Sequence, residues 1–217
     1  MGVAQLVNQA FFDIEMGIDD NKTITNLKEA ISDSTTEMDL PTYLRLAVLC
    51  GFYADTGFKN TSFMQYVSSV LHQSRTVEAL QSRNPDSEGI SFSPYYSDEL
   101  QHIEVSASEL NFLRWKHVGD RFLLATSLFD AYHRNRAQAR GLITRKDRVS
   151  FGKNAYRNAA TCATRFDKND FFLGLSDEFE MISFLLEHTA ETYLFPPVSP
   201  YEAQQAMNGL FDDFKDN

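Results

Sequence analysis

The sequence has few cysteines, no long apolar run and no secretory signal, and each of these features excludes a class of protein. Only Cys50 and Cys162 occur in 217 residues, so the chain cannot form the disulfide framework of a small secreted domain. No stretch approaches the roughly 20 apolar residues that a membrane-spanning helix requires. The first 12 residues lack the cationic start and the cleavage site of a secretory signal. We therefore expect a cytoplasmic or otherwise intracellular protein that is not secreted and does not engage a membrane.

The composition predicts an ordered, helical chain. Hydrophobic residues make up 43% of the sequence and aromatic residues 13%, with 18 phenylalanines, which argues against general disorder. Apolar residues recur at steps of three and four along most of the chain, whereas strand-like alternation is scarce. We expect an all-α multi-helix bundle of about seven to nine helices with a long central helix and a basic αα-hairpin.

The N-terminal half is expected to span residues 1–81. Its predicted helices cover residues 3–16, 24–31, about 40–53 and 60–81. Residues 82–97 contain Asn-Pro, Glu-Gly and Ser-Pro pairs and are expected to form a linker or loop, because such pairs punctuate regular structure. The C-terminal half is expected to span residues 98–217, and the two halves are expected to form one composite domain.

The C-terminal half contains the predicted αα-hairpin, residues 106–166. Ser106 and Glu109 resemble a capping box that begins a long helix with an aromatic face. Gly119 on that helix would either allow another helix to approach closely or mark a bend. Thr144 and Asp147 predict the start of the second helix. Two further helices are expected, one from Ser176 to the Pro-Pro pair at 196–197 and one from residue 199 towards 209.

Positive charge is concentrated in one part of an acidic chain. The net charge is −10, yet residues 134–168 carry ten bases against two acids. This segment holds half of the basic residues in about one sixth of the sequence. The segment from residue 176 onward carries nine acids against one base. The charge is therefore divided between a basic helical hairpin and an acidic C-terminal region.

The basic segment predicts a surface that binds the sugar-phosphate backbone of a nucleic acid. Arginine forks can bind phosphate oxygens through two hydrogen bonds, and each neutralised phosphate releases counterions. We therefore predict a non-enzymatic subunit that binds RNA or single-stranded DNA within a larger assembly, such as a nucleoprotein or coat. The predicted site consists of Arg134, Arg136, Arg140, Arg145, Lys146, Arg148, Lys153 and Arg157.

An alternative interpretation requires no nucleic acid. The basic helices could pair with the acidic C-terminal region of their own chain, or with acidic protein surfaces, in an assembly or adaptor protein that binds protein partners or self-associates. The acidic-aromatic end, residues 210–217, could also dock on a basic partner, although a disordered terminus is the simpler expectation. The sequence leaves these interpretations open.

The sequence predicts no catalytic, metal or cofactor site. Glu99 and His102 have the spacing of one carboxylate-bridged iron motif, but the second motif that such a site needs is missing. Residues 187–191 hold a further cluster of two acids and a histidine, and the pairs His117–Asp120 and His133–Asp130 place a histidine one turn from an acid. Such pairs suit a structural hydrogen bond as well as catalysis. Both cysteines lie among apolar residues, where packing is their expected role.

Overall fold

The part of the chain that the structure describes is helical throughout. The computed structural model describes residues 2–18, 21–33, 38–74, 109–128, 144–163 and 169–194, and these contain eight α-helices, two π-helical segments and no strand. The predicted all-α bundle is confirmed. In chain order the elements are α1 (Val3–Glu15), α2 (Asn21–Ser32), α3 (Leu40–Val48), η1 (Leu49–Ala54), α4 (Thr61–Gln73), α7 (Glu109–Ser127), α9 (Arg145–Cys162), α10 (Asn169–Asp177), α11 (Phe179–Thr189) and η2 (Ala190–Leu194).

Local capping explains where several helices begin. The Asp39 carboxylate accepts a hydrogen bond from the Thr42 amide at 2.8 Å and caps α3, which carries proline in its first turn. The Asn60 side chain caps α4 in the same way. The predicted capping box of α9 is present, because the Thr144 hydroxyl and the Asp147 carboxylate each bind the backbone amide of the other residue.

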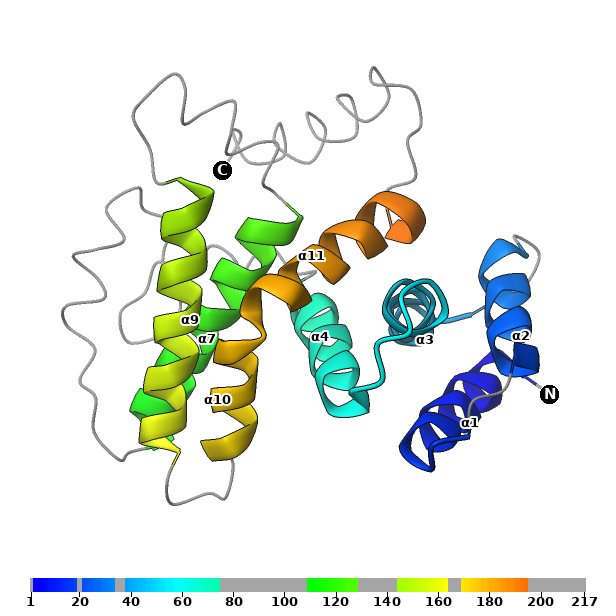
Figure 1. Cartoon of the computed structure of the whole chain (residues 1–217), viewed down its shortest axis with the longest axis horizontal. Coiled ribbons are helices and arrows are strands. Elements are labelled where there is room, and N and C mark those ends of the chain that lie inside the picture. Colours follow the sequence, from blue (N-terminus) through cyan, green and yellow to red (C-terminus); the bar gives the residue numbers. More distant parts are fainter. Residues whose placement is uncertain are drawn as a thin grey trace.

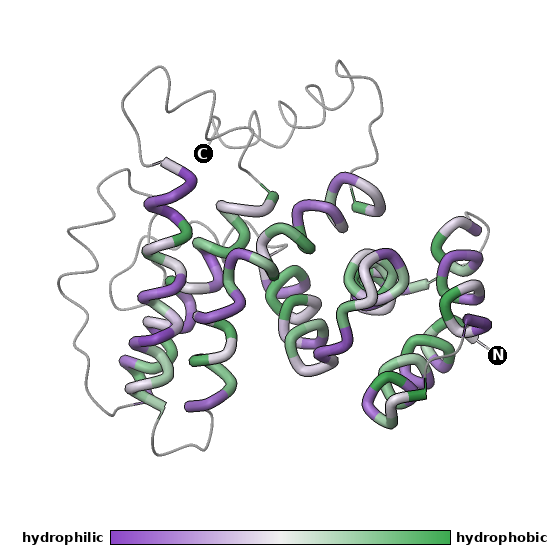
Figure 2. The backbone as a smooth tube through the Cα atoms, in the orientation of Figure 1, coloured by the Kyte–Doolittle hydropathy of each residue, from purple (hydrophilic) through white to green (hydrophobic). Residues whose placement is uncertain are grey.

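Helices from both predicted halves share one hydrophobic core. Helices α1 and α2 lie at one end of the molecule, α3 and α4 in the middle, and α7, α9 and α10 at the other end (Figure 1). Hydrophobic and hydrophilic positions alternate along the helices, as amphipathic packing requires (Figure 2). The core includes the fully buried side chains of Leu27, Phe52, Met64, Leu123 and Phe179. The predicted linker, residues 82–97, lies outside the described residues.

Glycines allow the helices around α9 to approach closely. A Cβ atom added at Gly119 of α7 would lie 2.5 Å from ring carbons of Tyr156, which belongs to α9. A Cβ atom at Gly152 of α9 would lie 2.2 Å from the Phe179 ring of α11. Both rings are fully buried, so neither can move aside without disturbing its neighbours. The prediction that Gly119 admits a neighbouring helix is confirmed.

Some predicted boundaries were wrong or lie outside the described residues. Ser176 does not begin a helix: it lies inside α10, which the sequence did not predict, and α11 begins at Phe179. The Ser176 side chain is buried and donates a hydrogen bond to the Lys153 carbonyl, so a serine that resembles a cap instead ties α10 to α9. Helix α4 ends at Gln73. Four other predictions concern segments outside the described residues. They are the capping box at Ser106, the end of the long helix, the hairpin tip and the helix after residue 199.

The part of the chain that the structure describes contains no candidate for a membrane-spanning helix. None of these helices is long and apolar enough to span a bilayer.

Candidate functional site

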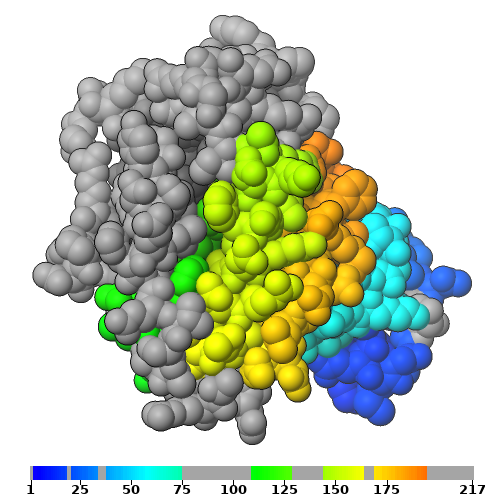
Figure 3. All heavy atoms as spheres, turned by 60° about the vertical axis from the view of Figure 1, so that its left-hand side comes forward, coloured from blue at the N-terminus to red at the C-terminus, as the bar shows by residue number. Residues whose placement is uncertain are grey.

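The predicted basic site lies partly on α9. Arg145, Lys146, Arg148, Lys153 and Arg157 all belong to this helix. The other three predicted cations, at positions 134, 136 and 140, lie outside the described residues. Helix α9 lies beside α10 and α11 on one face of the molecule, as the yellow-green and orange atoms of Figure 3 show.

Three cations of α9 are bound to carboxylates of the following helices. Arg145 Nη2 lies 2.8 Å from Glu187 Oε2, and Lys153 Nζ lies 2.5 Å from Glu180 Oε1. The lysine holds the pKa of Glu180 below its ordinary value. A longer contact of 3.8 Å joins Arg157 Nη2 to an Asp177 oxygen.

For these three cations, acids from the segment after α9 therefore supply ion-pair partners within the same chain. Such exposed pairs contribute only about 0–1 kcal/mol each to stability. Their main effect is to reduce the positive potential that α9 presents to solvent.

The two remaining cations differ in exposure. Arg148 is only 5% exposed, so its predicted place on an exposed tip is wrong. The first turn of α9 packs this side chain inward, because position 148 lies on the same side of the helix as the buried Gly152 and Ala155. Lys146 is exposed, and no ion pair holds it within the described residues. It lines a cavity of about 510 Å³ together with Arg145, Val149, Glu180 and Ser183.

Helix α11 presents a mixed acidic and apolar surface, which we call the α11 face. Four of its members belong to α11 and recur at steps of three and four, so they share one side of that helix. Phe184 is at its centre and is 63% exposed, and Met181 beside it is 39% exposed. The α11 face consists of Glu180, Met181, Phe184 and Glu187 of α11, together with Asp177 at the end of α10 and Glu191 in η2. Sequence inspection did not find it, because an apolar residue on an amphipathic helix is expected to face the core.

A second polar cluster lies in the interior and was also missed. The Asp120 carboxylate of α7 accepts hydrogen bonds from the hydroxyls of Tyr66 at 2.5 Å and Tyr156 at 2.9 Å, and it pairs with Lys116 Nζ at 2.7 Å. Burial, reinforced by the Asp120 charge, raises the pKa of both tyrosines well above the ordinary value. The sequence feature that could have indicated this cluster is the four-residue spacing between Lys116 and Asp120, because side chains at that spacing are neighbours on a helix.

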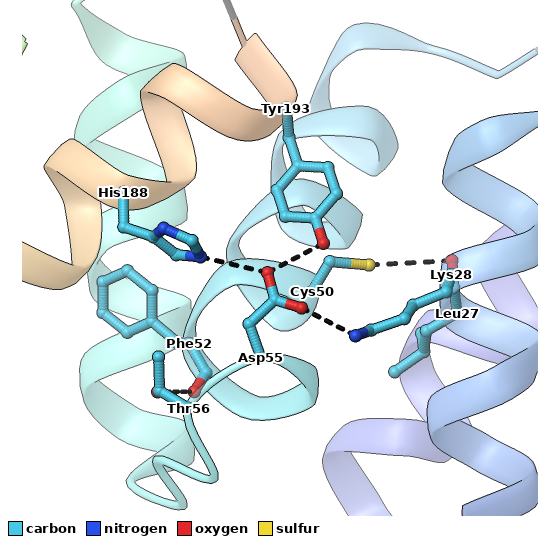
Figure 4. A network of polar contacts seen from close by, with 8 residues as sticks. All are labelled: Leu27, Lys28, Cys50, Phe52, Asp55, Thr56, His188 and Tyr193. Carbon is cyan, nitrogen blue, oxygen red and sulfur yellow. Dashed lines mark hydrogen bonds and ion pairs between the residues drawn. The ribbon is translucent and has the colours of Figure 1, made fainter. Parts of the chain in front are cut away.

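A third cluster is centred on Asp55, directly after η1 (Figure 4). Its carboxylate binds Lys28 Nζ of α2 at 2.8 Å, His188 Nε2 of α11 at 3.1 Å and the Tyr193 hydroxyl of η2 at 2.8 Å. Burial alone would raise the pKa of Asp55, but the hydrogen bonds from Lys28, Tyr193 and His188 together lower it. The cluster ties the N-terminal helices to the end of the described chain.

Cys50 lies beside this cluster and is buried. Its Sγ contacts the Leu27 carbonyl oxygen at 3.6 Å (Figure 4). Burial, with a smaller contribution from the Asp55 charge, raises the pKa of the thiol to about 12. Cys162 is also buried. Both cysteines therefore pack as the sequence predicted, since a thiol needs a lowered pKa and access to act as a nucleophile.

The histidine-acid pairs noted in the sequence do not form a common site. Asp120 is bound by the two tyrosines and Lys116, while Glu187 binds Arg145 and His188 binds Asp55. Within the described ranges no group of three or more His, Cys, Asp or Glu side chains could hold a metal ion. The Glu99–His102 and Asp130–His133 pairs lie outside those ranges.

The geometry defines an all-α helical bundle with a charged boundary between α9 and the two helices that follow it. Comparison with protein-family models, with curated proteins and with solved structures found no match for this chain.

Proposed function

We propose that this chain is a non-enzymatic assembly protein that binds a second copy of itself through the α11 face. The exposure of Phe184 carries the proposal. A phenylalanine that is 63% exposed at the centre of an acidic stripe gains little from the fold of its own chain. Burying such a side chain in an interface contributes about 2 kcal/mol, and aromatic residues at interface centres often contribute much of the binding energy.

The charges around Phe184 indicate the chemistry of the matching surface. Asp177 and Glu180 retain 72% and 67% side-chain exposure, although each contacts a cation of α9. The complementary surface must therefore be apolar with a basic rim. Another copy can supply that rim with Lys146, which is exposed at the start of α9. A two-fold axis would then join the acidic part of each copy to the basic part of the other.

Light scattering over a range of protein concentrations tests this proposal. The wild-type mass is expected to rise from 24.7 kDa towards twice that value with increasing concentration. Phe184→Asp should keep the monomer mass, because a carboxylate replaces the apolar centre of the interface. The matched control is Phe12→Asp on α1, where the native side chain is 53% exposed at the other end of the molecule. This control should assemble like the wild type.

Three outcomes would contradict self-assembly through the α11 face. These are a wild-type chain that stays monomeric at every concentration, a Phe184→Asp variant that still assembles, and a Phe12→Asp variant that loses assembly equally. Circular dichroism of each variant distinguishes a lost interface from a lost fold.

Binding of a nucleic-acid backbone is the second candidate function, and the exposure of Lys146 supports it. This lysine lies in the first turn of α9, where the positive end of the helix dipole also attracts phosphate. We expect Lys146→Glu combined with Arg140→Glu to weaken binding to RNA or single-stranded DNA and to reduce the log-log salt slope by roughly one unit per lost phosphate contact. The control is Lys59→Glu, which reverses the charge of an exposed side chain outside α9. Fluorescence anisotropy at two salt concentrations measures both effects, and no wild-type binding at low salt would exclude this function.

A further inference from the structure

A second cavity, separate from the α11 face, is lined by residues of α4, α7 and α10. Its volume is about 420 Å³, within the range of small-molecule sites. It is half-open to solvent. No residue of α9 or α11 is among the described residues that line it: Tyr66, Ser69, Val70, Gln73, Phe112, Leu113, Lys116, Phe171 and Phe172.

Four of the residues that line the cavity are aromatic, and their rings pack against one another. The rings of Phe112 and Phe172 meet edge to face with centroids 5.2 Å apart, and the rings of Tyr66 and Phe172 do so at 5.8 Å. Phe171 packs against Tyr66 at 5.3 Å in the same way. Each ring is therefore held by its neighbours, so the cavity is preformed. Aromatic walls of this kind favour a flat ring, which can add further edge-to-face or offset contacts.

Lys116 supplies positive charge to this aromatic wall. Its side chain is only 24% exposed, and its ammonium lies 2.7 Å from Asp120 Oδ2 and 5.2 Å from the centroid of the Tyr66 ring. An ammonium has three donors, and Asp120 accepts one of them. Asp120 also holds the lysine in place, because the two tyrosine hydroxyls fix its carboxylate. Lys116 is therefore a positioned cation with donors left for an anionic group.

We propose that this cavity binds a small molecule in which a planar aromatic ring carries an anionic group. The ring lies against Tyr66, Leu113 and Phe171, which keep exposed surface in the cavity, and the anionic group accepts a charge-assisted hydrogen bond from Lys116. Across the cavity, the Gln73 amide donates to the Ser69 hydroxyl at 3.1 Å. The Gln73 carbonyl oxygen can then accept a hydrogen bond from a polar substituent of the ligand. This site is independent of self-assembly and of nucleic-acid binding.

Two dyes with matched aromatic systems test both halves of the proposal. Anilinonaphthalene sulfonate carries an anionic group, and phenylnaphthylamine is its uncharged counterpart. With the wild-type chain we expect one bound sulfonate dye per chain by calorimetry, and roughly tenfold weaker binding of the neutral dye, as loss of one charge-assisted hydrogen bond implies. Lys116→Gln should weaken binding of the sulfonate dye roughly tenfold and leave binding of the neutral dye unchanged.

Filling the cavity should abolish binding of both dyes. Ser69→Phe places a ring in the mouth of the cavity from an exposed position of α4, and Ser150→Phe makes the same change at an exposed position of α9 outside the cavity. Ser69→Phe should bind neither dye, and Ser150→Phe should bind both dyes like the wild type. If Ser69→Phe does not fold, Leu113→Trp fills the same space from α7.

Several results would overturn the proposed site. The first is a folded wild-type chain that does not bind the sulfonate dye stoichiometrically. The second is a folded variant with a filled cavity that still binds both dyes like the wild type. The third is a Ser150→Phe control that loses dye binding to the same extent as the filled variant. Equal affinity for the two dyes, or a Lys116→Gln variant that binds the sulfonate dye like the wild type, would overturn the anionic part.

Discussion

Asp120→Ala is expected to lower the free energy of unfolding by about 3–5 kcal/mol, because the substitution removes the shared partner of three buried or half-buried groups. The fully buried Tyr156 hydroxyl would lose its acceptor, as would the hydroxyl of Tyr66. Lys116 would lose the carboxylate that it contacts at 2.7 Å. Urea denaturation followed by circular dichroism measures the loss.

Matched variants separate the contributions within this cluster. Tyr66→Phe and Tyr156→Phe each remove one hydroxyl and leave the carboxylate bound by the other phenol, so each should cost about 1–2 kcal/mol. Asp120→Asn preserves the side-chain shape and should cost less than Asp120→Ala. A folded Asp120→Ala variant with wild-type stability would contradict the view that this carboxylate organises the contact of α4, α7 and α9.

Gly152→Val is expected to destabilise the protein by about 3 kcal/mol, because α9 and α11 leave no room for a side chain at this position. The added Cβ would lie 2.2 Å from the Phe179 ring, and that ring is fully buried. The higher helix propensity of valine over glycine offsets only a few tenths of this cost. Thermal denaturation measures the change.

A double-mutant cycle tests the cause of the expected loss at Gly152. Phe179→Ala is destabilising by itself, but it removes the ring that the valine meets, so Gly152→Val should cost much less in that background. Asn154→Val, at an exposed position of the same helix, controls for the effect of a β-branched residue and should change stability by less than about 1 kcal/mol. An equal cost of Gly152→Val in both backgrounds would show that the ring is not responsible.

Helix positions were largely predictable from the sequence, because they depend on local signals. The capping box of Thr144 and Asp147 acts within one turn of backbone, and the structure confirms it. Other boundaries were less predictable, since α4 ends before residue 81 and the sequence did not predict α10. Its Ser176 resembles a helix start, but its hydroxyl is taken up by a carbonyl of α9, which no local pattern reveals.

The candidate sites were less predictable, because they join helices that are far apart in the sequence. The count of basic residues located α9 as a charged element, but it could not say which cations face solvent. Arg148 is buried, Arg145 and Lys153 are bound to acids of α11, and Lys146 remains exposed. The nucleic-acid function inferred from that charge stays a prediction.

The sequence by itself determined the helical class and the uneven distribution of charge, since apolar period and composition can be read directly along the chain. Only the tertiary structure decided that the basic helix pairs with acids of α10 and α11, that Phe184 faces outward, and that Asp120 and Lys116 border an aromatic cavity. Each of those outcomes depends on the relative placement of whole helices, which is set by packing of the shared core and not by any local pattern.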